Sequence, residues 1–257
     1  MADSLPFSGS FSGRSALVTG AASGIGAATA QWLDRHGIER LVLVDRDRAR
    51  LEALEIACAA ERHAGDVADE TFWQDLEAAL PPLDHAVVNA GIAAGGAIAE
   101  TSLAEWRRVL SVNLDGAFLT LRTALRKAND GAGIVVTASV SGLKAEPGTA
   151  AYGASKAGAI QLARIAAKEA APRGIRVNAI APGGVDTPIW DGLPFFREMV
   201  EQHGSRAAAM AEMGKLATPL GRYATAEEIA AQIGFLLSDA AATITGTVLT
   251  SDGGYTL

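Results

Sequence analysis

The sequence predicts an α/β fold in which a parallel sheet is covered by helices on both faces, within a single domain that spans residues 1–257. Two observations support this prediction. Short apolar segments of strand length alternate along the chain with segments whose apolar residues recur at helical spacing. No internal repeat, linker or low-complexity run divides the 257 residues, a length that one α/β domain can accommodate.

The composition excludes several classes of partner. Hydrophobic residues make up 49% of the chain, and the formal net charge of -7 offers no basic surface to nucleic acid or an anionic membrane. One cysteine, Cys58, and four scattered histidines predict neither a disulfide framework nor a metal site. The chain starts without a signal-peptide pattern and has no run of about 18 apolar residues. We therefore expect a cytoplasmic protein that acts on a small molecule.

The first predicted unit is a strand, a glycine turn and a helix. The strand spans Ser15–Thr19, the turn reads Gly-Ala-Ala-Ser-Gly-Ile-Gly at residues 20–26, and the helix spans Ala27–His36. Glycine permits a positive φ and close approach to a ligand, and a helix start offers unpaired N–H groups to a pyrophosphate. The pattern indicates a nucleotide site, although the spacing Gly-x3-Gly-x-Gly differs from the common G-x-G-x-x-G.

A carboxylate follows the second predicted strand, Leu41–Val44. Asp45 lies 19 residues beyond Gly26, the offset at which a doubly wound, Rossmann-type fold binds the adenosine ribose. A carboxylate there accepts from the 2′-hydroxyl and repels a 2′-phosphate, so the sequence favours NAD over NADP. Arg46 argues the other way, because a guanidinium binds phosphate. The alternative role for Asp45 is to cap the following turn.

Further polar groups are expected at the same sheet edge. Asp66 is predicted either to receive the adenine amine or to cap the helix that starts at Asp69, and Asn89-Ala90-Gly91 is predicted to form a turn that leaves room for a ligand. The elements predicted around these residues are a short helix at Leu51–Cys58, a strand at Glu61–Ala64, a helix at Asp69–Leu80 and a strand at Asp84–Val88.

A long helix is predicted at Leu103–Leu125, where apolar residues recur at helical spacing. Asn113 lies beside this apolar stripe. A buried amide costs stability unless it is hydrogen-bonded, so Asn113 is either a satisfied core residue or a functional one.

The residues with the clearest chemistry lie between Ser139 and Lys156. Tyr152 and Lys156 are four residues apart, so on a helix they project from one face about one turn apart. A nearby ammonium favours the phenolate, so we expect Lys156 to lower the pKa of Tyr152 from its ordinary value of about 10. Ser139 follows the predicted strand Gly133–Val136 and should emerge at its carboxyl end, where open α/β sheets bind ligands.

The remainder of the chain completes the sheet. A strand at Arg176–Ile180 leads into the loop 181–188, and a last helix at Glu227–Leu237 precedes a last strand at Thr247–Thr250. Residues 189–216 are rich in aromatic and methionine side chains, which suits a movable lid over an apolar ligand. Ordinary packing of two short helices explains this composition equally well.

Taken together, these residues resemble the simple single-domain branch of the short-chain dehydrogenase/reductase family over nearly the whole chain. The sequence departs from the usual pattern at Val88, where many members carry a second asparagine. The motifs that carry the resemblance are TGAASGIG at Thr19–Gly26, NAG at Asn89–Gly91, the tetrad residues Asn113, Ser139, Tyr152 and Lys156, and Pro182-Gly183 with Thr187.

The resemblance implies an enzyme that moves a hydride between NAD and a secondary alcohol or ketone. Tyr152 would be the general acid/base, Ser139 would hold the substrate oxygen, Lys156 would lower the phenol pKa and bind the nicotinamide ribose, and Asn113 would anchor a water. The implied cofactor site comprises Gly20, Ser23, Gly24, Ile25, Gly26, Asp45, Arg46, Asp66, Val67, Asn89, Ala90, Gly91, Tyr152, Lys156, Pro182, Gly183, Val185 and Thr187.

The substrate is expected to be hydrophobic or cyclic, with specificity set at the carboxyl edge of the sheet, including Gly95 and Gly96. The residues expected to contact the substrate are Ser139, Leu143, Glu146, Tyr152 and Trp190.

Two other functions remain open at this stage. A reductase of 3-oxoacyl thioesters on an acyl carrier protein fits the same motifs, with Arg126 and Arg173 available for a basic patch. A non-catalytic NAD-binding sensor or scaffold is less consistent with an intact tetrad. The helix of small residues after Tyr152 and the long striped helix resemble the surfaces through which members of the family pair, so we expect a homo-oligomer, a tetramer or a dimer.

Overall fold

The computed structural model describes residues 11–257; the polar start of the chain lies outside the described residues. Within them, seven parallel strands form one sheet in the order β3-β2-β1-β4-β5-β6-β9, which confirms the predicted doubly wound, Rossmann-type fold. The strands are β1 (Ser15–Thr19), β2 (Arg40–Asp45), β3 (Ala59–Ala64), β4 (Leu83–Val88), β5 (Ala128–Thr137), β6 (Arg176–Pro182) and β9 (Val248–Ser251).

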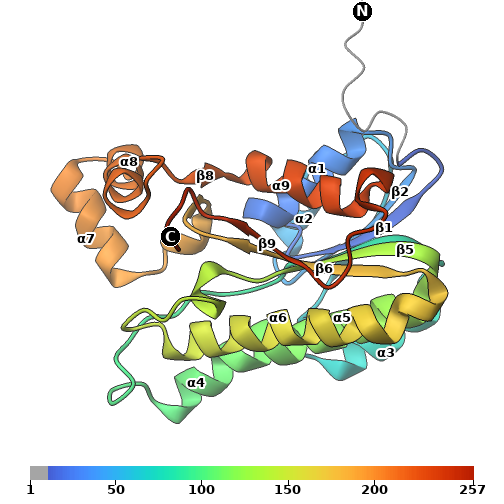
Figure 1. Ribbon diagram of the computed structural model, residues 1–257, viewed down its shortest axis with the longest axis horizontal. Coiled ribbons are helices and arrows are strands. Elements are labelled where there is room, and N and C mark those ends of the chain that lie inside the picture. Colours follow the sequence, from blue (N-terminus) through green and yellow to red (C-terminus); the bar gives the residue numbers. More distant parts are fainter. Residues whose placement is uncertain (1–10) are drawn as a thin grey trace, which may run out of the picture.

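Helices cover both faces of the sheet (Figure 1). One face carries α1 and α9, and the other carries α3, α4, α5 and α6. The helices are α1 (Gly24–Arg35), α2 (Arg48–Ala53), α3 (Glu70–Ala79), α4 (Leu103–Leu110), α5 (Gly116–Lys127), α6 (Ala150–Ala170), α7 (Pro194–His203), α8 (Arg206–Ala217) and α9 (Ala226–Leu237).

The strand order places the site. β1 pairs with β2 on one side and with β4 on the other, so the direction in which the chain winds reverses between β1 and β4. Loops leaving adjacent strands at such a point diverge and leave a crevice at their carboxyl ends. The glycine turn after β1 and the Asn89–Gly91 turn after β4 both lie at this crevice.

The predicted helix at Leu51–Cys58 is wrong. The helix α2 lies earlier because the Asp47 carboxylate accepts a hydrogen bond from the Arg50 N–H at 3.1 Å and caps its start. After α2, the Asp34 carboxylate accepts from the backbone N–H groups of Ala57 and Cys58. These two hydrogen bonds engage the N–H groups of Ala57 and Cys58, so residues 54–58 do not continue α2.

The predicted helix at Leu103–Leu125 is interrupted. α4 and α5 are joined by one π-helical turn at Ser111–Asp115, in which the Gly116 N–H donates to the Ser111 carbonyl. Asn113 lies within this turn and is buried. Such turns hold one extra residue and often occur at functional sites.

A buried histidine lies inside the sheet, away from the crevice. His85 on β4 is 2% exposed and packs against the ring of Phe11, with 5.3 Å between ring centroids. Neither ring nitrogen has a hydrogen-bond partner among residues 11–257. Burial, with the positive charges of Arg14 and Arg176, lowers the pKa of His85 to about 4, although Asp84 acts in the opposite direction.

This histidine should make stability depend on pH. The unfolded chain takes up a proton near pH 6.5 and the folded chain only near pH 4, so acidification between these values favours unfolding. Denaturant unfolding at pH 7.5 and 5.0 should show that the wild type loses about 2 kcal/mol more stability than His85→Leu. Equal losses in the two proteins would contradict this account.

Candidate active site

The glycine turn is shaped by close backbone contacts. Gly20 has a φ of 66°, and a Cβ atom there would lie 2.9 Å from the Ala90 Cα atom. A Cβ atom on Gly26 would lie 2.0 Å from the carbonyl oxygen of Gly20. Both positions therefore require glycine, because the start of α1 packs directly on the turn and the turn packs on the end of β4.

The start of α1 is open to an anion. Ser23 is its N-cap residue, but the Ser23 side chain makes no capping hydrogen bond. The first N–H groups of the helix and the positive end of its dipole thus lack a side-chain cap, which suits a pyrophosphate. A Cβ atom on Gly24 would lie 3.3 Å from the side chain of Thr187, so the loop after β6 lies against this turn. Ile25 is half-buried beside it.

The Asp45 carboxylate binds the protein itself at the end of β2. One oxygen accepts from the Ala22 N–H at 3.0 Å and the other from the Asp47 N–H at 2.9 Å. Asp45 therefore holds the glycine turn and also caps its own turn, the alternative role considered for it. A carboxylate has about four acceptor positions, so capacity for a ribose hydroxyl remains. Arg46 is exposed and makes no ion pair within residues 11–257.

The turns after β3 and β4 are held by hydrogen bonds between side chains and backbone groups. Asp66 is exposed and accepts from the Ala68 N–H, whereas Asp69 caps α3. The Val67 carbonyl accepts from the Trp73 indole N–H at 2.8 Å. Asn89 is bonded twice to Thr19 at the end of β1, through its own N–H and through Nδ2. This pairing joins β1 and β4 at the crevice.

Tyr152 and Lys156 lie on the same side of α6. The Lys156 Nζ atom lies 5.8 Å from the centroid of the Tyr152 ring and donates to the Thr137 carbonyl at 2.9 Å. Ser139 precedes the short turn Val140–Gly142, and its side chain interacts with that of Tyr152. A Cβ atom on Gly142 would lie 2.7 Å from the Lys156 carbonyl carbon, so this turn packs closely on α6. The structure thus brings the three predicted groups together.

The expected lowering of the Tyr152 pKa is not found in the protein alone. Burial raises the pKa of Tyr152, and the interaction with the Ser139 side chain opposes that rise. Lys156 is also buried, and the loss of hydration lowers its pKa to about 8. Desolvation disfavours both the phenolate and the ammonium, so it acts against the effect expected from their proximity.

Asn113 reaches this cluster from the π-helical turn. Its Oδ1 atom accepts from the Ile92 N–H at 2.8 Å, and its Nδ2 atom donates to the Ile92 carbonyl and to the Ser155 hydroxyl. The Ser155 hydroxyl in turn donates to the Tyr152 carbonyl at 2.7 Å. A Cβ atom on Gly91 would lie 3.3 Å from the Lys156 Nζ atom.

Sequence reasoning missed Ile92, Thr137 and Ser155, which hold the predicted residues in place. Ser155 lies three residues after Tyr152, a spacing that could have identified it. The contributions of Thr137 and Ile92 come from backbone groups, which no side-chain pattern reveals.

The loop after β6 completes the crevice. Gly183 donates its N–H to the Ser251 carbonyl, which ties the loop to the end of β9 beyond the buried Pro182. The Val185 carbonyl accepts from the Trp190 indole at 2.7 Å. The Thr187 hydroxyl contacts that same carbonyl at 3.5 Å, the limit of a hydrogen bond, and so retains capacity to donate to a ligand.

Two predicted substrate residues lie on the segment after Ser139. Leu143 is 46% exposed, as expected for a residue that could contact a ligand. The Glu146 carboxylate lies 3.7 Å from the Lys144 Nζ atom and interacts with the Tyr255 side chain. The Lys144 ammonium also donates to the Tyr255 carbonyl. Tyr255, three residues from the end of the chain and absent from the sequence prediction, therefore supports this segment.

The third predicted substrate residue, Trp190, packs within the 189–216 segment. Its ring is stacked on Tyr223, with 5.8 Å between centroids and an interplanar angle of 8°. The segment also has a small core of its own around Phe196, Ala209 and Met210. Ordinary packing of two helices thus accounts for much of its aromatic and methionine content.

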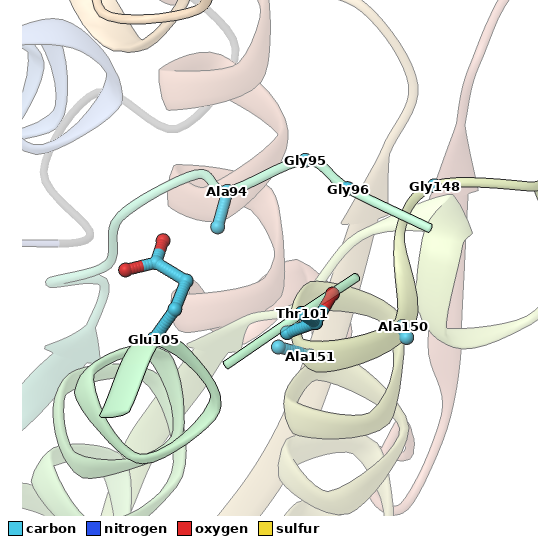
Figure 2. A pocket seen from close by; sticks show the side chains of 8 residues that line it. All are labelled: Ala94, Gly95, Gly96, Thr101, Glu105, Gly148, Ala150 and Ala151. Atoms are coloured by element: carbon cyan, nitrogen blue, oxygen red, sulfur yellow. The ribbon is translucent and has the colours of Figure 1, made fainter. Parts of the chain in front are cut away.

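A narrow cavity lies between α6 and the loop after β4 (Figure 2). The Gly96 N–H donates to the Gly148 carbonyl and closes one side of it. Glu105 rises into it from α4, but its carboxylate is bound by two nitrogens of Arg108. The cavity therefore offers mainly small side chains and backbone; its lining residues are Ala94, Gly95, Gly96, Thr101, Glu105, Gly148, Ala150 and Ala151.

Two other kinds of feature are absent from residues 11–257. No group of three or more histidine, cysteine, aspartate or glutamate side chains is arranged to hold a metal ion. Among these residues, no helix combines the length and apolar character needed to cross a membrane.

Comparison with known proteins decides the family. The family described as enoyl-(acyl carrier protein) reductase matches residues 20–256. A cis-4-hydroxycyclohexanecarboxylate dehydrogenase from Sinomonas cyclohexanicum is 41% identical, over 96% of this chain and 98% of that protein. The chain belongs to the short-chain dehydrogenase/reductase family.

Other members of this family support the assignment at the levels of sequence and fold. A cyclohexanol dehydrogenase from Acinetobacter sp. (strain SE19) is 36% identical over 97% of each chain. A crystal structure of levodione reductase matches with a TM-score of 0.84 and 36% identity, covering 95% of this chain and 97% of that one. Several relatives of this short-chain dehydrogenase/reductase are thus named as oxidoreductases of ring compounds.

The residues of this family member fit a nicotinamide cofactor. The uncapped start of α1 and the glycine turn could hold its pyrophosphate, because both present backbone N–H groups without an obstructing side chain. At Gly91 a side chain would fill the space beside the Lys156 ammonium and the Asn113 amide. The crevice between β1 and β4 therefore has the shape and the free backbone donors that such a cofactor requires.

Proposed function

We propose that this protein is an NAD-dependent dehydrogenase that interconverts a hydrophobic or cyclic secondary alcohol and its ketone, with Tyr152 as the general acid/base. The observation that carries the proposal is the cluster in which the Ser139 side chain interacts with Tyr152 while Lys156 lies beside the same ring. This cluster stands at the carboxyl edge of the sheet, next to the cradle that fits a nicotinamide cofactor.

In the proposed mechanism the protein manages the proton. Tyr152 gives a proton to the ketone oxygen in reduction and removes one from the alcohol in oxidation, and Ser139 orients that oxygen. A bound nicotinamide would supply or accept the hydride. Lys156 has three N–H donors and uses one on Thr137, so it has donors left for a ribose hydroxyl.

Asn113 is proposed to anchor a water that connects the site to bulk solvent. Its Nδ2 group donates to the Ile92 carbonyl and the Ser155 hydroxyl, and its Oδ1 atom accepts from the Ile92 N–H, which fixes the loop after β4 against α6. One acceptor position of Oδ1 remains for the water, because an amide oxygen has two lone pairs.

The names of the relatives support a cyclic substrate. A cis-4-hydroxycyclohexanecarboxylate dehydrogenase, a cyclohexanol dehydrogenase and a levodione reductase are all more than a third identical to this chain. We propose that Leu143, Glu146 and Trp190 contact the ring of the substrate. Glu146 would accept from a polar substituent, since Lys144 and Tyr255 keep its carboxylate in place.

NAD is the proposed cofactor because of Asp45. Its carboxylate is held by the glycine turn and so stands as a fixed negative charge at the end of β2. A fixed carboxylate repels a 2′-phosphate more than it disturbs a 2′-hydroxyl. Arg46, being exposed, would have to swing over this position to favour NADP.

The reductase of acyl carrier thioesters is the weaker alternative, although the matching family carries a related description. Arg126 is ion-paired with Glu77, and Arg173 binds Asp130 together with two backbone carbonyls. Both arginines are thus engaged within the chain rather than free to receive an acidic carrier. One relative is named as an inactive dehydrogenase, so catalysis itself has to be tested.

We also propose that the protein forms a homo-oligomer through α4, α5 and α6, which lie side by side (Figure 1). Phe118 on α5 and Ile165 on α6 are 45% and 44% exposed. Apolar side chains exposed on adjacent helices favour contact with another copy. The cytoplasmic location stays a prediction that rests on the single cysteine.

Replacing the proposed acid/base should stop turnover without removing the cofactor site. Tyr152→Phe should lower kcat for cyclohexanol with NAD by about a thousandfold, within the range of general acid–base catalysis. NADH affinity, measured by fluorescence titration, should change little. Tyr223→Phe keeps the stacked ring and is the matched control. Unaffected turnover in Tyr152→Phe would refute the mechanism. Turnover of small polar alcohols as fast as that of cyclic or hydrophobic ones would refute the proposed substrate class.

The same enzyme should respond to pH in opposite ways in the two directions. Because burial raises the Tyr152 pKa, the phenolate needed for alcohol oxidation increases with pH across the neutral and mildly alkaline range. Oxidation should therefore speed up between pH 7 and pH 9, whereas ketone reduction should not. A flat oxidation profile would count against Tyr152 as the base.

Cofactor choice should follow Asp45. Fluorescence titration of the wild type should give tighter binding of NADH than of NADPH. In Asp45→Ser the ratio of the NADPH Kd to the NADH Kd should fall by about tenfold, which is the usual effect of losing a charge-assisted contact. Arg46→Ala is the matched control and should leave NADH binding unchanged. Tighter NADPH binding in the wild type would overturn the NAD assignment and bring reductive chemistry to the front.

Oligomerisation should depend on the two exposed apolar side chains. Light scattering at micromolar concentration should show an oligomer for the wild type and a smaller species when Phe118→Asp and Ile165→Asp are combined. Leu220→Asp is the control, because Leu220 is 74% exposed but lies outside these helices. A monomeric wild type would remove the proposal.

A further inference from the structure

Arg206 joins three chain positions that flank the cofactor site. It is the first residue of α8, and its guanidinium is bound to the Asp186 carboxylate, to the Asp191 carboxylate at 3.0 Å and to the Thr187 carbonyl at 2.8 Å. The guanidinium also lies 5.8 Å from the ring centroid of Phe196. One side chain therefore connects the loop 186–191 to the start of α8.

The position of Thr187 gives this contact its importance. The Thr187 side chain is buried against Gly24 at the start of α1, whereas the Thr187 carbonyl is held by Arg206. The residue is thus fixed between the glycine turn on one side and α8 on the other. Its hydroxyl has only a weak contact, with the Val185 carbonyl at 3.5 Å, so the backbone position decides where it points.

The chemistry of arginine suits this arrangement. A guanidinium is planar and carries five N–H donors in fixed directions, so it can satisfy acceptors on three sides at once. The two carboxylates remain about half exposed, at 48% and 52% of their side-chain surface. Exposed ion pairs contribute little to global stability, so the main effect of Arg206 is on local geometry.

The segment beyond Arg206 behaves as a unit. α7 and α8 share the small core of Phe196, Ala209 and Met210, so a displacement at one end is carried to the other. Arg206 connects this unit directly to the Thr187 carbonyl. A ligand that contacts Thr187 and a ligand that contacts the 189–216 segment would each favour the same position of the loop 186–191. Each ligand would then increase the affinity for the other, because such coupling is reciprocal.

We propose that Arg206 is a positioning residue that holds Thr187 for the nicotinamide and thereby couples the 189–216 segment to cofactor binding. The proposal rests on the proposed function, since it requires that Thr187 contacts the cofactor. Arg206 touches neither the reacting atoms nor the tetrad. It acts through the carbonyl of Thr187 and the two carboxylates on either side.

The test compares NADH affinity with stability in matched variants. Arg206→Ala should weaken NADH binding, measured by fluorescence titration, by about tenfold, while the denaturant midpoint of the apoprotein changes little. Arg206→Lys keeps the charge but not the three-way geometry and should recover only part of the loss. Arg197→Ala is the control, because Arg197 is exposed on α7 and, within the described part of the chain, donates only to the Asp191 carbonyl.

A second readout separates positioning from stability. In the wild type, NADH should slow amide hydrogen exchange in residues 206–216, and in Arg206→Ala this protection should be lost at saturating NADH. Should Arg206→Ala fail to fold, Asp191→Asn removes one partner charge at constant size and should show a smaller loss of affinity in the same direction.

The outcomes distinguish this proposal from the one on which it rests. A wild type that binds neither NADH nor NADPH would refute the proposed function itself. A wild type that binds NADH, together with an Arg206→Ala protein of equal affinity and equal protection, would refute the role of Arg206 alone.

Discussion

The whole site depends on how closely the backbone of α1 approaches the turn after β1. A single methyl group on Gly26 would lie 2.0 Å from the Gly20 carbonyl oxygen, a distance that no rearrangement of side chains can relieve. With that contact made, the helix start faces the crevice and Gly20 reaches the end of β4. The Asp45 carboxylate then secures the turn from the side of β2. The crevice proposed to hold the cofactor is therefore shaped by packed backbone, and few side chains are needed to form it.

The chemical groups obey a different constraint, which is desolvation. Lys156, Asn113 and Ser139 are all buried, and each has a hydrogen-bond partner that compensates for lost water. Burial disfavours charge on both Tyr152 and Lys156 in the protein alone. A tyrosine that stays protonated at neutral pH is well prepared to donate to a ketone. It is less well prepared to take a proton from an alcohol.

Much of this arrangement could be predicted from the sequence, for reasons that differ between its parts. The sheet was predictable because buried parallel strands are short apolar runs, and Tyr152 and Lys156 because their spacing matches a helical turn. The π-helical turn at Ser111–Asp115 was not, since apolar periodicity barely changes across one extra residue. The contact of Asp45 with the glycine turn and the contacts of Arg206 with residues 186–191 were also hidden, because they join groups that are distant in sequence.

The π-helical turn has a geometric consequence for everything that precedes it. One extra residue advances a helix by about 100° around its axis, so α4 and α5 present faces that are out of phase with each other. Val109 of α4 is buried while its neighbours Arg107 and Arg108 face solvent, and the pattern restarts on α5 with Gly116 and Ala117 buried. Removing a single residue here would keep the helix but rotate α4 and the loop before it. The π-helical turn thus changes the rotation of α4 relative to α5, so that each helix can bury a different face.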